Sequence, residues 1–374
     1  MFEKLGKFIV KRSKVVLLTF IITTIIAGAV GSLSFGRLDS GGYSDLNSDS
    51  AKAAKYVVDV FGAEEPVVVM VVDSASSTID DPAVASTAIE IEKKIQNHEG
   101  VSKTYSYWST GGSPTMKSKD GKAGFILVYS DIDAFDWDAL SAVGASLQEE
   151  FDGKYKNVQI YASGAGVITY AINHKIEKDL ILAESIAIPL TFLLLVFVFG
   201  ALVASATPLF VGVTAILGSF FIIYILTLFT NVSVFALNLI TGLGLGLGID
   251  YALLMVNRFR EELHNGHSVE ESVVTTVATA GKTVFYSGLT VLVTMASLLF
   301  FPLEFLKSFG YAGVAVITFA VIGAVIALPA LLAVLGEKVD KGVVRKSAIT
   351  PKEDGRWAHT ARNVMQRPVP VVIA

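Results

Sequence analysis

The sequence predicts an α-helical polytopic membrane bundle of six transmembrane helices plus the start of a seventh, with an inserted α+β domain. Hydrophobic residues make up 52% of the 374 residues, charged residues only 17%, and the mean hydropathy is +0.59. Several apolar runs exceed the roughly 18 residues that cross a bilayer. A long polar segment, residues 37–177, separates the first run from the second.

The six transmembrane helices are expected where the apolar runs lie. The runs are Val15–Phe35, Leu180–Gly200, Ala204–Phe229, Val234–Asn257, Thr283–Phe301 and Phe309–Leu335. The first run is about 20 residues long, longer than the 7–15 residues of the apolar part of a signal peptide. We therefore interpret it as an uncleaved anchor helix.

Charge predicts the orientation, because cytoplasmic loops carry an excess of lysine and arginine. Both ends of the chain are basic, whereas the connections 230–233 and 302–307 hold one basic residue, Lys307. Segment 37–177 has 12 basic and 21 acidic residues. We expect a cytoplasmic N-terminus and a large acidic domain outside. The chain has no cysteine, so this domain has no disulfides.

Segment 37–177 shows alternating helix and strand patterns. The expected helices are Ser50–Phe61, Pro82–Asn97 and Phe135–Phe151, and the expected strands are Pro66–Asp73, Val101–Trp108, Lys122–Asp131 and Val158–Ala162. Asp80 and Asp81 are start signals for the second helix, and the first helix has apolar residues at helical spacing, namely Ala54, Val57, Val58 and Phe61. From the first strand onward the order is β-α-β-β-α-β, that of a ferredoxin-like split βαβ unit. This fold hosts many activities and says nothing alone about function.

No catalytic or metal-binding pattern emerges, so an enzyme is not expected. The aspartates at 131, 133, 136 and 138 lack the glycine and terminal glutamate of a calcium loop and fit a helix start better. His264 and His267 are three apart with no other ligand type beside them, and we interpret them as solvated. No nucleotide-binding P-loop is present, and the Gly-rich run inside a span is not a dinucleotide fingerprint.

The most informative residue is Asp250, near the middle of the fourth span. A carboxylate at such depth costs about 2.5–3.5 kcal/mol on insertion scales, so a use for it is expected. Gly242 and Gly246 share its helix face, and Gly244 and Gly248 are also four apart. This spacing lets another helix approach closely, so we expect Asp250 to face protein. Helix packing and hinge mobility both remain open for the glycines.

The fifth span carries a stripe of hydroxyl side chains at intervals of 4, 3, 4 and 3. Its members are Thr283, Ser287, Thr290, Thr294 and Ser297. They lie within about 80° on the helix and are able to hydrogen-bond Asp250 or to hold waters. Ordinary packing between helices is the alternative. Tyr251, beside the aspartate, is able to donate a hydrogen bond to a carboxylate.

Asp250 would serve as a proton carrier that loads from outside and releases inward once the bundle rearranges. Moving one charge across the membrane potential is worth about 2.3 kcal/mol per 100 mV. A static, neutral, hydrogen-bonded acid is the alternative. The hypothesis is a proton-coupled transporter that needs no cofactor, with the proton gradient as its energy source.

Two amphipathic segments flank the bundle. In the link 258–281, Ser268 and Glu271 have capping-box spacing, which predicts a short helix along the inner surface. Residues 357–366 have the pattern of an amphipathic lead-in to a further span that would begin at about Arg367.

Several stretches resemble one membrane protein family. Gly248–Leu263 (GIDYALLMVNRFREEL) closely resembles the signature of the mycobacterial membrane protein large (MmpL) family, within the resistance-nodulation-division superfamily. Val196–Gly200 with Pro208 after it, and Ala278–Leu289, agree with this resemblance. The order of one helix, a large domain and five helices is similar to half of such a transporter.

The resemblance implies export of lipids or other hydrophobic or amphiphilic molecules, driven by the proton-motive force. Asp250 and Tyr251 match the proton-relay pair, and Ser287 matches a small polar residue beside it. The expected setting is a bacterial inner or plasma membrane. The expected partners are a lipid or hydrophobic substrate, the bilayer, and a second homologous half or another protomer, with no nucleic acid.

The expected division is 1–36 for the amphipathic start and first helix, 37–177 for a porter-like domain, 178–336 for helices two to six, and 337–374 for a linker and the start of a truncated seventh helix. A lipid-binding receptor or scaffold similar to sterol-sensing modules is one alternative. An auxiliary of protein translocation is another.

Overall fold

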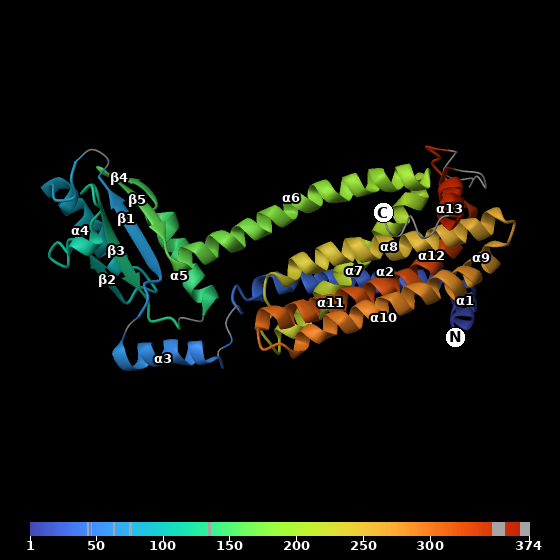
Figure 1. The fold of residues 1–374 in the computed structure, drawn as a ribbon, viewed down its shortest axis with the longest axis horizontal. Coiled ribbons are helices and arrows are strands. Elements are labelled where there is room, and N and C mark those ends of the chain that lie inside the picture. Colours follow the sequence, from blue (N-terminus) through green and yellow to red (C-terminus); the bar gives the residue numbers. More distant parts are fainter. Residues whose placement is uncertain are drawn as a thin grey trace.

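The computed structural model describes residues 1–42, 45, 47–62, 64–74, 77–133, 136–345 and 356–366. A sheet domain lies at one end and a helical bundle at the other, and the long helix α6 (Ala165–Phe199) joins them (Figure 1). The N-terminus and α13 (Arg356–Gln366) lie at the end of the bundle far from the sheet (Figure 1).

The sheet domain contains five strands in the order β2-β3-β1-β5-β4, each antiparallel to its neighbours. The strands are β1 (Val68–Asp73), β2 (Lys103–Ser106), β3 (Ala123–Tyr129), β4 (Gly153–Tyr155) and β5 (Val158–Ser163). Alternate residues of β1, namely Val68, Met70 and Val72, are fully buried. They share one core with apolar residues of α4 (Pro82–Gln96) and α5 (Trp137–Phe151).

Acidic residues begin these helices, as the sequence predicts. The Asp81 carboxylate accepts a hydrogen bond from the Ala83 N–H, and Asp136 accepts one from Ala139. Phe135, the predicted first residue of α5, lies outside the described residues, and the helix begins at Trp137. The strand β4 was not predicted, because three residues are too few to show an alternating pattern.

The bundle contains six stretches long and apolar enough to cross a membrane. They are Ser13–Arg37, Ala165–Phe199, Leu202–Leu226, Ala236–His264, Val269–Phe300 and Glu304–Asp340. Their α-helical parts are α2 (Ser13–Gly31), α6, α7 (Leu202–Thr227), α8 (Ala236–His264), α9 (Val269–Thr276), α10 (Lys282–Ala296), α11 (Glu304–Ile322) and α12 (Leu328–Leu335). The six predicted spans are thus confirmed as apolar helices, and α6 begins well before the predicted Leu180.

The link before α10 differs from the prediction. Ser268 and Glu271 do form the capping box that starts α9. However, α9 continues through one π-helical segment, Val277–Gly281, into α10, so it is the first part of a long helix and not a separate one. The predicted start of a seventh span, residues 367–374, lies outside the described residues.

A short strap, Asp39–Gly42, ties the bundle to the sheet domain. Asp39 forms a parallel bridge with Ser233, and the Phe305 N–H donates to the Gly42 carbonyl. On its other side, the strap donates from the Ser40 N–H to Asp138 at the start of α5. The connections 228–235 and 301–303 therefore lie at the end of the bundle that faces the sheet.

The helix α3 (Asp49–Phe61) projects from the sheet domain (Figure 1). Its predicted apolar face, which includes Val57, Val58 and Phe61, is exposed, and none of its residues is buried against the described part of the chain.

Candidate functional site

One face of α8 packs tightly against its neighbours through two glycines. A Cβ atom added at Gly248 would lie 2.7 Å from the Cα of Gly212 in α7, and one added at Gly244 would lie 2.6 Å from the Ile216 side chain. No side chain larger than hydrogen fits there without a shift. These close approaches are what a helix-packing role for Gly244 and Gly248 requires.

The other glycine face of α8 is open. Gly242 and Gly246 are exposed, and no described atom lies within 4 Å of a Cβ built on either. Asp250, one turn further along, is exposed too. The described chain therefore leaves this face uncovered, and the expectation that Asp250 faces protein stays a prediction. The spacing correctly places the three residues on one face, but what covers that face is not set by the helix itself.

Tyr251 points into the bundle. It is only 7% exposed, and a Cβ added at Gly288 of α10 would lie 3.6 Å from its hydroxyl. The hydroxyl lies beside the Ser287 side chain and within the electrostatic reach of Asp250. The Tyr251 hydroxyl forms no hydrogen bond with any described group. The structure thus brings Asp250, Tyr251 and Ser287 together, with one hydroxyl free to bond.

The hydroxyl stripe of α10 and the residues after it is exposed along its whole length. Four of its hydroxyls donate to carbonyls of their own helix, at 3.4, 3.0, 3.0 and 2.7 Å for Thr283, Thr290, Thr294 and Ser297. They do not bond Asp250. Ser287 is the one member of the stripe that the described structure places beside the Asp250–Tyr251 pair.

The helices α8 and α10 both pack on α11 (Figure 1), and polar groups on both are exposed. We call this surface the open polar face. Its members are Gly242, Gly246, Asp250, Ser287, Thr290 and Thr294. Its carboxyl and hydroxyl groups are able to hydrogen-bond whatever lies against them.

An ion network at the far end of α8 was missed by sequence reasoning. The Arg260 side chain is 7% exposed, and its Nε lies 2.8 Å from Asp340 Oδ1. His264 lies 3.4 Å from the same carboxylate, and His267 lies 2.9 Å from Glu262. Both histidines are exposed, as the sequence predicts, and each also lies beside a carboxylate. The cluster of charges at residues 258–264 indicates an ionic end of α8 but not its distant partner Asp340.

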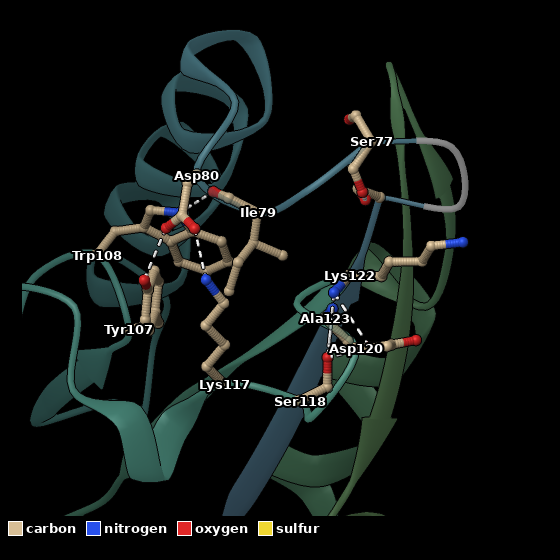
Figure 2. A network of polar contacts seen from close by, with 11 residues as sticks. Ser77, Ile79, Asp80, Tyr107, Trp108, Lys117, Ser118, Asp120, Lys122 and Ala123 are labelled. Carbon is tan, nitrogen blue, oxygen red and sulfur yellow. Dashed lines mark hydrogen bonds and ion pairs between the residues drawn. The ribbon is translucent and has the colours of Figure 1, made fainter.

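A second polar network lies in the sheet domain (Figure 2). Asp80 accepts hydrogen bonds from Tyr107 and Lys117, and the Trp108 indole N–H donates to the Ile79 carbonyl at 3.0 Å. The bonds from Lys117 and Tyr107 hold the pKa of the Asp80 carboxyl below its usual range. The network pins the turn-rich connection between β2 and β3 to the start of α4, which is a structural role.

Comparison with known proteins places these features in one family. The sequence matches the MMPL family over residues 43–371. A putative membrane protein of Streptomyces coelicolor is 33% identical over 376 residues, which cover all of this chain and 52% of that protein. The trehalose monomycolate exporter MmpL3 of Mycobacterium tuberculosis is 30% identical over 402 residues, 97% of this chain and 42% of the relative.

The mycolic acid-containing lipids exporter MmpL11 of Mycolicibacterium smegmatis is 30% identical over 235 residues, which cover 62% of this chain and 25% of that protein. The chain spans about half the length, or less, of these curated relatives. The match over most of its residues and the identity to these proteins show that the chain belongs to the MMPL family.

Proposed function

We propose that this chain is one half of a membrane transporter that exports lipids or other amphiphilic molecules and is driven by the proton-motive force. The names of two relatives, a trehalose monomycolate exporter and a mycolic acid-containing lipids exporter, support lipid as the substrate class. The coupling to protons rests on the site, and above all on the position of Asp250.

Asp250 lies on a glycine-lined face of an apolar helix that the rest of the described chain leaves open. A carboxylate facing hydrocarbon is costly, and such residues in membrane proteins face a bundle interior or a water-filled cavity. A second homologous half, or another protomer, therefore covers the open polar face. Gly242 and Gly246 leave room for the partner's helix to approach closely.

Within this covered site, Asp250 would carry the proton. The Tyr251 hydroxyl, which has no bond to any described group, would orient the carboxyl group or pass a proton to it. Ser287 lies beside that hydroxyl and extends the path along α10. The ion pair between Arg260 and Asp340 joins the end of α8 to the residues after α12, so a movement of α8 at Asp250 would be transmitted to those residues.

The sheet domain would be an extracytoplasmic porter domain of ferredoxin-like topology. The strand order β2-β3-β1-β5, with α4 and α5 on one face, supports that topology. The acidic balance of residues 37–177 and the basic chain ends support a location outside the membrane with a cytoplasmic N-terminus. Substrate would reach this domain from the outer leaflet.

The test is proton flux into proteoliposomes under an imposed pH gradient, measured on the full-length gene product. Asp250→Asn removes the titrating group, and Asp152→Asn, at an exposed carboxylate of the sheet domain, is the matched control. We expect flux in the parent and the control and none in Asp250→Asn. Equal flux in all three, or none in any, would overturn proton coupling and favour a lipid-binding receptor or scaffold.

Coverage of the open polar face is tested separately. Because the chain has no cysteine, Gly246→Cys adds a single thiol to it. A membrane-permeant maleimide should label this thiol in the 374-residue chain alone and label it at least tenfold more slowly in the full-length product. Equal labelling in both would show that no second half covers the face.

A further inference from the structure

A band of basic side chains lies on α1 (Phe2–Lys11), at the end of the bundle far from the sheet domain (Figure 1). Lys4, Lys7 and Lys11 are exposed and, at 100° per residue, lie within about 60° of one another on the helix. Arg12 and Lys14, exposed as well, continue the positive charge toward α2. We call these five residues the basic band.

The opposite face of α1 is already docked on protein. Gly6 and Ile9 are buried, and a Cβ added at Gly6 would lie 3.0 Å from the Cα of Val274 in α9. The Phe2 ring packs edge-on against Phe285 of α10, with centroids 5.6 Å apart. The apolar side of this helix is therefore used by the bundle, and the basic side is left for another partner.

Only a few acidic groups lie near the basic band, and they neutralise part of its positive charge. Lys7 pairs with Glu3 at 2.6 Å. Lys7 and Lys11 also line a shallow hollow of about 470 Å³ with Glu270 and Glu271. Glu271 is engaged in the capping box of α9. Lys4 and Lys11 form no ion pair with any described residue, and the charge of the band stays positive.

An aromatic side chain lies among these cations. Phe8 is 53% exposed, and the Arg12 guanidinium lies 6.0 Å from its ring centroid. An exposed ring beside lysines and arginines suits the boundary between headgroups and acyl chains. The location fits, because α2 enters its apolar span directly after Arg12.

We propose that the basic band binds anionic phospholipid headgroups at the membrane surface. Each basic residue near an anionic leaflet contributes about 1 kcal/mol, a factor of about five in affinity. The long lysine side chains reach headgroup phosphates while their helix stays docked. Because α1 contacts α9 and the π-helical segment before α10, bound lipid would also hold the junction that leads to Ser287.

The experiment measures the selectivity of reconstituted full-length protein for spin-labelled phosphatidylglycerol over spin-labelled phosphatidylcholine in phosphatidylcholine vesicles. The test variant replaces Lys4, Lys7, Lys11 and Arg12 by glutamine. The matched control replaces four exposed lysines of the sheet domain, Lys52, Lys55, Lys119 and Lys154, by glutamine. A variant with arginine at the three lysine positions keeps the charge and checks the fold.

We expect the selectivity for phosphatidylglycerol to fall at least fivefold in the test variant and to stay unchanged in the control and in the arginine variant. In the parent, the selectivity should fall at high salt, where the Debye length is about 3 Å at 1 M. Selectivity that survives in the test variant, or that falls equally in the control, would overturn the proposal. Lipid selectivity is measured independently of proton flux, so the lipid-binding proposal stands or fails separately from the transport proposal.

Discussion

The contrast between the two glycine faces of α8 gives the sharpest prediction. Gly248→Ala places a methyl group 2.7 Å from the Cα and 2.9 Å from the N of Gly212. Ordinary van der Waals contact begins at about 3.4 Å, so α7 and α8 must separate by about 0.7 Å, the difference between 3.4 and 2.7. Both obstructing atoms belong to the backbone, so no side chain can rotate away. Gly246→Ala meets no described atom within 4 Å.

The difference in stability between these two variants isolates the packing cost. Each substitution gains helix propensity of about 1 kcal/mol, and this gain cancels in the comparison. Overpacking a well-packed interior costs about 1–3 kcal/mol. We therefore expect Gly248→Ala to be about 1–3 kcal/mol less stable than Gly246→Ala.

The assay is reversible unfolding of the 374-residue chain in mixed micelles with increasing SDS, followed by circular dichroism. Equal unfolding midpoints for the two variants would refute the close approach of α7 and α8 at Gly212. In the full-length product the ranking of effects should change. There Gly246→Ala should slow proton flux, because a second half would contact that face, although in the chain alone it should stabilise the helix by about 1 kcal/mol.

Three further predictions concern other parts of the molecule. Glu92, which is 7% exposed, accepts a hydrogen bond from Ser106 Oγ at 2.6 Å. Glu92→Ala should therefore destabilise the sheet domain by about 2–3 kcal/mol in urea titrations. An unchanged free energy of unfolding would contradict this buried hydrogen bond. Burial raises the pKa of the Asp39 carboxyl above its ordinary 3.8. Its stabilising contribution is therefore present below pH 3.8 and lost as pH rises through the folded-state pKa. Asp39→Asn should raise the melting temperature at pH 7 and not at pH 3.5, and an equal effect at both would argue against a buried acid in the strap. Ser268→Ala should cost about 1 kcal/mol and speed amide exchange in α9, and unchanged exchange would argue against the capping box.

Local features were predictable because their causes lie within a few residues. The Ser268–Glu271 capping box and the helix start at Asp81 are set by neighbouring side chains and backbone, and both are found where expected. The six apolar runs were also predictable, because the hydropathy along the sequence shows them directly. The helix starting at Ala165 was placed too late, because its first turns, near the sheet domain, are not apolar enough to read as a span.

The arrangement around Asp250 was predicted only in part. The four-residue spacing places Gly242, Gly246 and Asp250 on one face, but whether another helix covers that face depends on segments far away or on another chain. The pairing of Arg260 with Asp340 joins residues 80 positions apart, and no local pattern indicates it. The periodicity of the sequence does not predict long-range contacts of this kind.

The length of α6 gives the sheet domain a mechanical connection to the membrane. The helix has 35 residues, about 52 Å at 1.5 Å per residue, and Pro189 lies inside it. Proline lacks the N–H that would bond the Ser185 carbonyl, so the helix bends most easily there. The arm from Pro189 back to Ala165 is about 36 Å long.

A bend of about 10° at Pro189 would carry the start of α6 sideways by about 6 Å, more than the length of one helical turn. The strap at Asp39–Gly42 is a second point that anchors the same domain to the end of the bundle that faces the sheet. An arm with one tethered end cannot swing freely, so bending would make the domain pivot about the strap. Small tilts within the bundle would thus be converted into rotation of the sheet domain relative to the bundle.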